Sequence, residues 1–79
     1  MTLTLYFREY CGLCHQMLTE LEVWRQRYGF ELEIRDVDAD PALLERFDEW
    51  VPVLMEGETE ICHYHLETQR LAAHLGEIS

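Results

Sequence analysis

The chain has 79 residues, 48% of them hydrophobic, which is enough for one small globular domain and too apolar for a disordered segment. Sixteen acidic residues outnumber six arginines and give a net charge of −10, which disfavours nucleic acid and anionic lipid as partners. No apolar run approaches the roughly 20 residues of a membrane span, and the first residues lack the architecture of a signal peptide. We therefore expect a cytoplasmic, monomeric protein with a single domain, residues 1–79.

The first half of the chain alternates between strand and helix patterns. Residues 2–7, TLTLYF, have apolar side chains at both odd and even positions, which is typical of a strand covered on both faces. Residues 12–28 carry apolar side chains at helical spacing, and Gly29 follows as the expected C-cap. Residues 30–37 alternate between apolar and charged, which predicts a half-exposed strand at a sheet edge.

The second half begins with a short helix. Asp40 suits the N-cap and Pro41 the first helical position, and the pattern ends near residue 48. Two short strands follow at 51–55 and 59–64, with a glycine-containing turn between them, so they are predicted to form a hairpin.

A last helix is predicted over 66–75, ended by Gly76. The element order is then β-α-β-α-β-β-α. A helix joins the first two strands, so they should be parallel, whereas the final pair should be antiparallel. We therefore predict an α/β fold with a four-stranded mixed sheet flanked by three helices, which cover both of its faces.

Two of the three cysteines lie close together in the stretch EYCGLCHQM, as Cys11 and Cys14. Such a pair is a redox couple, half of a metal site, or a coincidence within a packed core. A reducing compartment disfavours structural disulfides, so catalysis or metal binding is the stronger reading there.

The pair falls where the first strand passes into the first helix. Cys11 is expected near the helix N-cap, where free backbone N–H groups and the helix dipole favour a thiolate. Cys14 lies one turn further in and should be more buried. In thiol–disulfide exchange, Cys11 would be the nucleophile and Cys14 the resolving cysteine, and Gly12 and Leu13 between them permit the close approach that a disulfide requires.

The element order, the CxxC at a helix start and the later Val51-Pro52 together resemble the thioredoxin-fold superfamily, and within it the small bacterial glutaredoxin-like proteins. The resemblance covers nearly the whole chain. It implies a thiol–disulfide oxidoreductase with a cis Val51–Pro52 bond, at which the backbone of Val51 pairs with the main chain of the substrate.

The candidate substrate-binding residues surround these two motifs. They are Tyr10, Gly12, Leu13, Val51 and Pro52. Trp50, two residues before the proline, is a further candidate for a wall of the groove, since aromatic side chains often line clefts. The expected partners are a disulfide-containing protein or small thiol substrate and an external reductant.

The chain also departs from the pattern of the family it resembles. The residues between the cysteines are Gly-Leu, without the proline of thioredoxins, and Arg8 is the only basic residue near the pair. The Gly-Gly pair with which glutaredoxins bind glutathione is missing before the last helix. The exchange itself needs no cofactor. Glutathione is a candidate reductant, but the missing glycines argue against it.

A second group of metal-ligating residue types, Cys62, His63 and His65, lies on the last predicted strand and its exit. Strand alternation sends Cys62 and His63 to opposite faces, so Cys62 is expected to be a buried hydrophobic residue and no metal site is predicted. His15 is expected to turn toward solvent.

Two alternatives to an oxidoreductase remain: a metal or iron–sulfur binding module, and a redox-inactive interaction domain.

Overall fold

A computed structural model describes residues 1–76 of the chain. Its elements, in chain order, are β1 (Thr2–Phe7), α1 (Gly12–Tyr28), β2 (Glu31–Asp36), a 3₁₀ turn η1 (Val37–Ala39), α2 (Pro41–Phe47), β3 (Val53–Glu56), β4 (Thr59–His63) and α3 (Thr68–His74). The predicted order of strands and helices is confirmed, with η1 added after β2.

Most of the predicted boundaries after α1 shift by one or two residues, and three of the shifts have a clear local cause. The strand predicted over 30–37 ends at Asp36, whose side chain accepts a hydrogen bond from the backbone N–H of Asp38 and so begins η1. The strand predicted from residue 51 begins at Val53, because Pro52 has no N–H to donate to a sheet. The last helix starts at Thr68, since Glu67 keeps an extended backbone as its N-cap.

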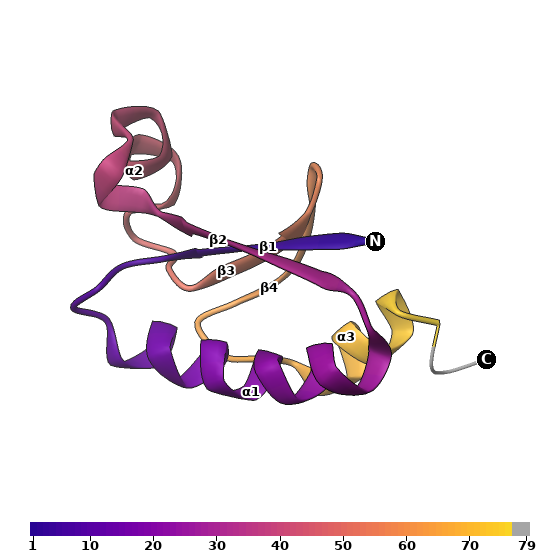
Figure 1. The fold of residues 1–79 in the computed structure, drawn as a ribbon. Helices are drawn as coiled ribbons and strands as arrows, with labels where there is room; N and C mark the ends of the chain where they lie inside the picture. Colours follow the sequence, from indigo (N-terminus) through magenta and orange to yellow (C-terminus); the bar gives the residue numbers. More distant parts are fainter. Residues whose placement is uncertain (77–79) are drawn as a thin grey trace.

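The four strands form one mixed sheet in the order β2-β1-β3-β4 (Figure 1). β1 runs parallel to β2 and antiparallel to β3, and β3 and β4 form the predicted antiparallel hairpin. The sheet topology therefore agrees with the prediction.

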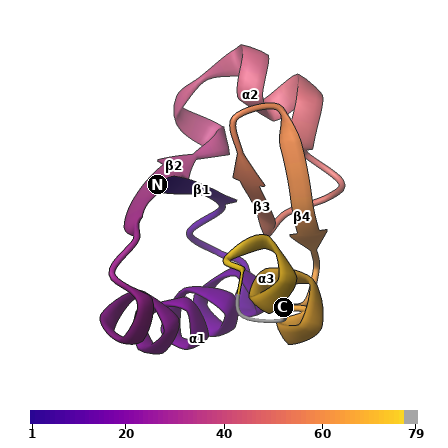
Figure 2. The same ribbon diagram turned by 90° about the vertical axis from the view of Figure 1, so that its right-hand side faces the viewer.

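Helices cover both faces of the sheet, as predicted (Figures 1 and 2). α1 and α3 lie together on one side and α2 lies on the other. Two cores result. The core between the sheet and α1 and α3 contains Leu3, Leu5, Met17, Leu21, Phe30, Leu54, Ile61, Cys62 and Leu71. The smaller core beneath α2 contains Val37, Phe47, Val53 and Met55.

The edge strand β2 is less covered than its alternating sequence predicts. Leu32 is half-buried, but Ile34, on the same parity, is 43% exposed. β2 has a neighbouring strand on only one side, which leaves its side chains open to solvent.

The helix ends follow their capping residues. Gly29 adopts a left-handed conformation with φ 75° after α1 and donates its N–H to the carbonyl of Arg25 at 2.8 Å. Asp40 caps α2 by accepting from the N–H of Ala42, and Pro41 occupies the first turn. Within residues 1–76 no helix has the length and apolar character to cross a membrane.

Candidate active site

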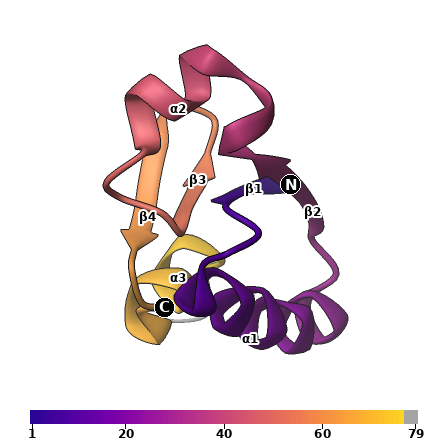
Figure 3. The same cartoon turned by 90° about the vertical axis from the view of Figure 1, so that its left-hand side faces the viewer.

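The turn after β1 leads directly into the start of α1 (Figure 3). Cys11 is the last residue of this turn, directly before Gly12. The N–H of Cys11 donates to the carbonyl of Arg8 at 3.1 Å, which closes this turn. Cys11 itself has the extended backbone of an N-cap residue, and the N–H of Cys14 donates to its Sγ at 3.1 Å. The predicted position of Cys11 at the N-cap is thus confirmed.

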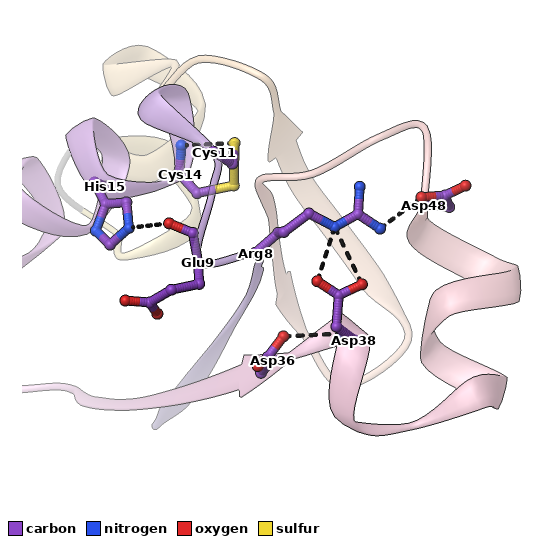
Figure 4. Close-up of polar contacts among 8 residues, drawn as sticks. All are labelled: Arg8, Glu9, Cys11, Cys14, His15, Asp36, Asp38 and Asp48. Atoms are coloured by element: carbon purple, nitrogen blue, oxygen red, sulfur yellow. Dashed lines mark hydrogen bonds and ion pairs between the residues drawn. A yellow bond between two sulfur atoms is a disulfide. The ribbon is translucent and has the colours of Figure 1, made fainter.

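Cys11 and Cys14 form a disulfide, with their Cα atoms 5.1 Å apart (Figure 4). Cys14 is fully buried, whereas Cys11 is half-buried and keeps a path to solvent. The two sulfurs are therefore unequal, as the sequence predicts. Solvent has access to Cys11, and the N–H of Cys14 is aimed at the Cys11 sulfur, where it favours a thiolate.

The Val51–Pro52 peptide bond is cis, which confirms the prediction drawn from the resemblance. Pro52 is buried and Val51 half-buried, directly before β3. Val53, the first residue of β3, pairs with Tyr6 near the C-terminal end of antiparallel β1. The cis bond before β3 and the turn that leads from β1 to Cys11 therefore lie at the same end of these two strands.

The remaining candidate substrate-binding residues are open to solvent. Tyr10 is 92% exposed, Leu13 is 38% exposed, and no atom lies within 4 Å of a Cβ added at Gly12. Tyr10 therefore projects from the turn into solvent, and Gly12 and Leu13 are open to solvent on the first turn of α1.

An aromatic cluster flanks the cis proline. Trp50, 46% exposed, stacks on the ring of Tyr64 with centroids 6.1 Å apart and meets the ring of His63 edge-on at 5.5 Å. Tyr64 donates its N–H to the carbonyl of Pro52 and its hydroxyl to the carbonyl of Glu49, at 2.9 and 2.8 Å. Trp50 is thus held beside the proline, where a groove wall was predicted.

Sequence reasoning missed Tyr64. Its φ of 65° places it in the left-handed region, where glycine or asparagine is the usual signal. A tyrosine after a strand gives no such signal, so its bonds to the proline loop are visible only in the structure.

Arg8 does not face the cysteines. Its guanidinium bonds to the carboxylates of Asp38 and Asp48, at 3.1 and 2.6 Å (Figure 4). The hydrogen bonds that Arg8 donates to Asp48 and Asp38 raise the pKa of Arg8 above its ordinary value. The one basic residue near the pair therefore joins the β1–α1 turn to η1 and α2, and two aspartates offset its charge.

Replacing Arg8 with glutamine is expected to loosen this turn. Asp38 and Asp48 lose their shared cation, and the Arg8 carbonyl, acceptor for the Cys11 N–H, loses its anchor. Hydrogen exchange followed by NMR should show several-fold faster exchange at the Cys11 amide. Arg25→Gln, which removes the same charge from a pair with Glu22 inside α1, is the control. Equal exchange at Cys11 in both variants would contradict the role of Arg8.

His15 is exposed, as predicted, but it also has a partner. Its Nε2 lies 2.8 Å from the carbonyl of Glu9, and its ring meets that of Phe7 edge-on at 5.8 Å between centroids. With its proton on Nε2 the imidazole donates to Glu9 and braces the turn before Cys11 from the helix side (Figure 4).

Cys62 is fully buried in the core beneath α1 and α3, as predicted. His63 lies on the other face of β4, with Nδ1 3.0 Å from a carboxylate oxygen of Glu60. Across residues 1–76 no three His, Cys, Asp or Glu side chains gather as metal ligands.

Burial raises the pKa of the Cys62 thiol above its ordinary value, which predicts a pH effect on stability. Above about pH 8.5 the unfolded chain ionises this thiol while the folded chain keeps its proton. The free energy of unfolding should therefore be fully retained below that pH and fall above it, by at most about 1.4 kcal/mol per pH unit.

Urea unfolding of the oxidised protein at rising pH, beside Cys62→Ala, checks this effect. With Cys11 and Cys14 held in the disulfide, Cys62 is the remaining titratable thiol. The variant should lack this part of the alkaline decline. If the free energy of unfolding fell equally with rising pH in the wild type and in Cys62→Ala, the buried thiol would not contribute to the alkaline loss of stability.

Comparisons place the chain among known folds. A family model described as a glutaredoxin-like domain (DUF836) matches residues 2–76. Protein Ne2328 from Nitrosomonas europaea is 35% identical, with a TM-score of 0.79 over 92% of this chain and 88% of its own. Protein XcR50 from X. campestris is 30% identical, with a TM-score of 0.73 over 98% of this chain and 99% of its own.

More distant structures share the fold alone. Thioredoxin 1 from Thermosipho africanus is 17% identical, with a TM-score of 0.68 over 98% of this chain and 97% of its own. No curated protein sequence matches the chain. A thioredoxin-like fold with a CxxC pair at a helix start supports a redox-type function.

Proposed function

The chain belongs to the glutaredoxin-like domain family (DUF836), and from this premise we propose that it is a thiol–disulfide oxidoreductase that uses Cys11 as nucleophile and Cys14 as resolving cysteine. One observation carries the proposal. Cys11 is the half-buried N-cap of α1, and the fully buried Cys14 lies within disulfide reach behind it. This arrangement favours attack at one sulfur and closure by the other.

The exchange begins with the reduced pair. The thiolate of Cys11 attacks one sulfur of a substrate disulfide, so that the substrate S–S bond breaks and a mixed disulfide forms. The departing substrate thiolate takes up a proton. Cys14 then loses its proton and attacks the Cys11 sulfur, which releases the second substrate thiol. Two electrons pass to the substrate, and the protein is left with the Cys11–Cys14 disulfide.

The substrate main chain is proposed to lie along Val51 and Pro52, with Tyr10, Gly12 and Leu13 on the opposite side. The exposure of the latter three residues and the shared end of β1 and β3 support this placement. A main chain beside Val51 would bring its cysteine in front of Cys11. No dissociable cofactor takes part in these steps.

An external thiol reductant, either a small thiol or a protein dithiol, must return the pair to its reduced state. We propose a cytoplasmic setting and a monomer for this cycle. A reducing compartment would keep the pair available as a dithiol, which supports the cytoplasmic setting.

The Cys14→Ser variant tests the order of the two steps. Without a resolving thiol, the reduced variant mixed with bis(2-hydroxyethyl) disulfide should accumulate a mixed disulfide on Cys11, visible by mass spectrometry after acid quenching. The wild-type protein should pass through this adduct to the intramolecular disulfide. An adduct that maps to Cys62, or no adduct at all, would contradict the assignment of Cys11 as nucleophile.

A further inference from the structure

A cleft of about 240 Å³ opens beside the redox pair, between α1 and the segment that links β4 to α3. Its walls are Leu13, Gln16, Met17, Glu20, Tyr64, His65 and Leu66. Leu13 lies between the two cysteines in the sequence, so the cleft begins at the reactive site and runs along α1 to Glu20.

The charge within this cleft is negative. The side chain of Glu20 is exposed and has no ion-pair partner in the described part of the chain. None of the six arginines lines the cleft. Five of the six form ion pairs with carboxylates elsewhere, and Arg27 lies over the ring of Tyr28. An anionic ligand such as glutathione would meet a carboxylate here without an arginine to offset it.

We propose that this cleft selects disulfide-bearing polypeptides with a lysine or arginine near the reacting cysteine, and that Glu20 is the specificity-determining residue. The inference rests on the proposed oxidoreductase function and names its substrate class. A free carboxylate in a cleft otherwise lined by neutral polar and apolar groups and one imidazole complements a basic side chain whose stem packs on Leu13 and Leu66.

The spacing fixes where the basic residue should lie. Glu20 follows the nucleophile Cys11 by nine residues, a rise of about 13 Å along α1. An extended substrate strand rises about 3.3 Å per residue. The basic residue is therefore expected about four positions from the reacting cysteine.

The test uses two peptides that differ only at this position, one with lysine and one with glutamate, each as a symmetrical disulfide dimer. Bis(2-hydroxyethyl) disulfide is the uncharged reference. Single-turnover rates are measured with reduced protein at low ionic strength, where charges are least screened. The lysine peptide should react about three- to tenfold faster than the glutamate peptide, and about 0.5 M salt should shrink this ratio.

Glu20→Gln should lower the lysine-to-glutamate rate ratio toward one and leave the rate with the uncharged disulfide unchanged. Glu45→Gln is the matched control, since it removes the same charge from an exposed residue of α2 on the other face of the sheet. A ratio near one in the wild-type protein, or an equal fall in both variants, would overturn the role of Glu20 while leaving the redox function standing. Failure to reduce even the uncharged disulfide would overturn both proposals.

Discussion

Replacing Cys11 with serine is expected to reduce the rate of disulfide reduction to the uncatalysed background. A serine hydroxyl does not ionise near neutral pH, and the buried Cys14 has no comparable access to a substrate. Removal of a covalent nucleophile typically costs at least about 10³-fold in rate. The rate with bis(2-hydroxyethyl) disulfide, followed with dithiothreitol as the recycling reductant, measures this loss.

Cys62→Ala is the control for the loss of a thiol. Cys62 is remote from solvent and lies in the core beneath α1 and α3, so its removal should leave the rate nearly unchanged. If Cys11→Ser kept a substantial part of the activity, or if Cys62→Ala lost it, the assignment of the nucleophile would be wrong.

The second large effect concerns the fold that presents the pair. Leu54→Ala is expected to lower the free energy of unfolding by about 2–5 kcal/mol, since it removes a fully buried side chain from β3. Leu54 sits between Leu5 of β1 and Cys62 of β4 in the sheet register, where little repacking is available. For a chain of this size each kcal/mol lowers the melting temperature by about 4–8 °C.

Thermal and urea unfolding of the oxidised wild type and of oxidised Leu54→Ala measures this loss of unfolding free energy. Val23→Ala, at a residue of α1 that is 66% exposed, is the matched control and should stay within about 0.5 kcal/mol of the wild type. A loss at Leu54 as small as at Val23 would mean that the sheet core does not carry the stability assigned to it.

Periodicity and capping predicted most of this architecture. The apolar spacing of α1, the Gly29 C-cap and the Asp40-Pro41 helix start are local signals, and each adopts the expected conformation. Periodicity could not predict the exposure of Ile34. That exposure depends on which strand lies at the sheet edge and on how far α1 extends beneath this strand. Local patterns carry alternation along a strand but do not specify its neighbours.

Some features of the candidate site also follow from local patterns in the sequence, and others depend on the folded chain. The unequal positions of Cys11 and Cys14 follow from a helix start, so the sequence sufficed to predict them. The Arg8 bonds to Asp38 and Asp48 join residues 30 and 40 positions apart, which no local pattern encodes. The same is true of the cleft that Glu20 lines together with the segment after β4, which exists only once the chain has folded.

Cys11 and Cys14 should exchange between dithiol and disulfide at a potential suited to the reduction of other disulfides. A titration of the purified protein against glutathione redox buffers, with the two states separated by mass, tests it most directly. We predict a single two-electron transition to the Cys11–Cys14 disulfide between about −200 and −280 mV, the range of known exchange proteins. Two thiols that stay reduced and inert across that range would contradict the redox assignment.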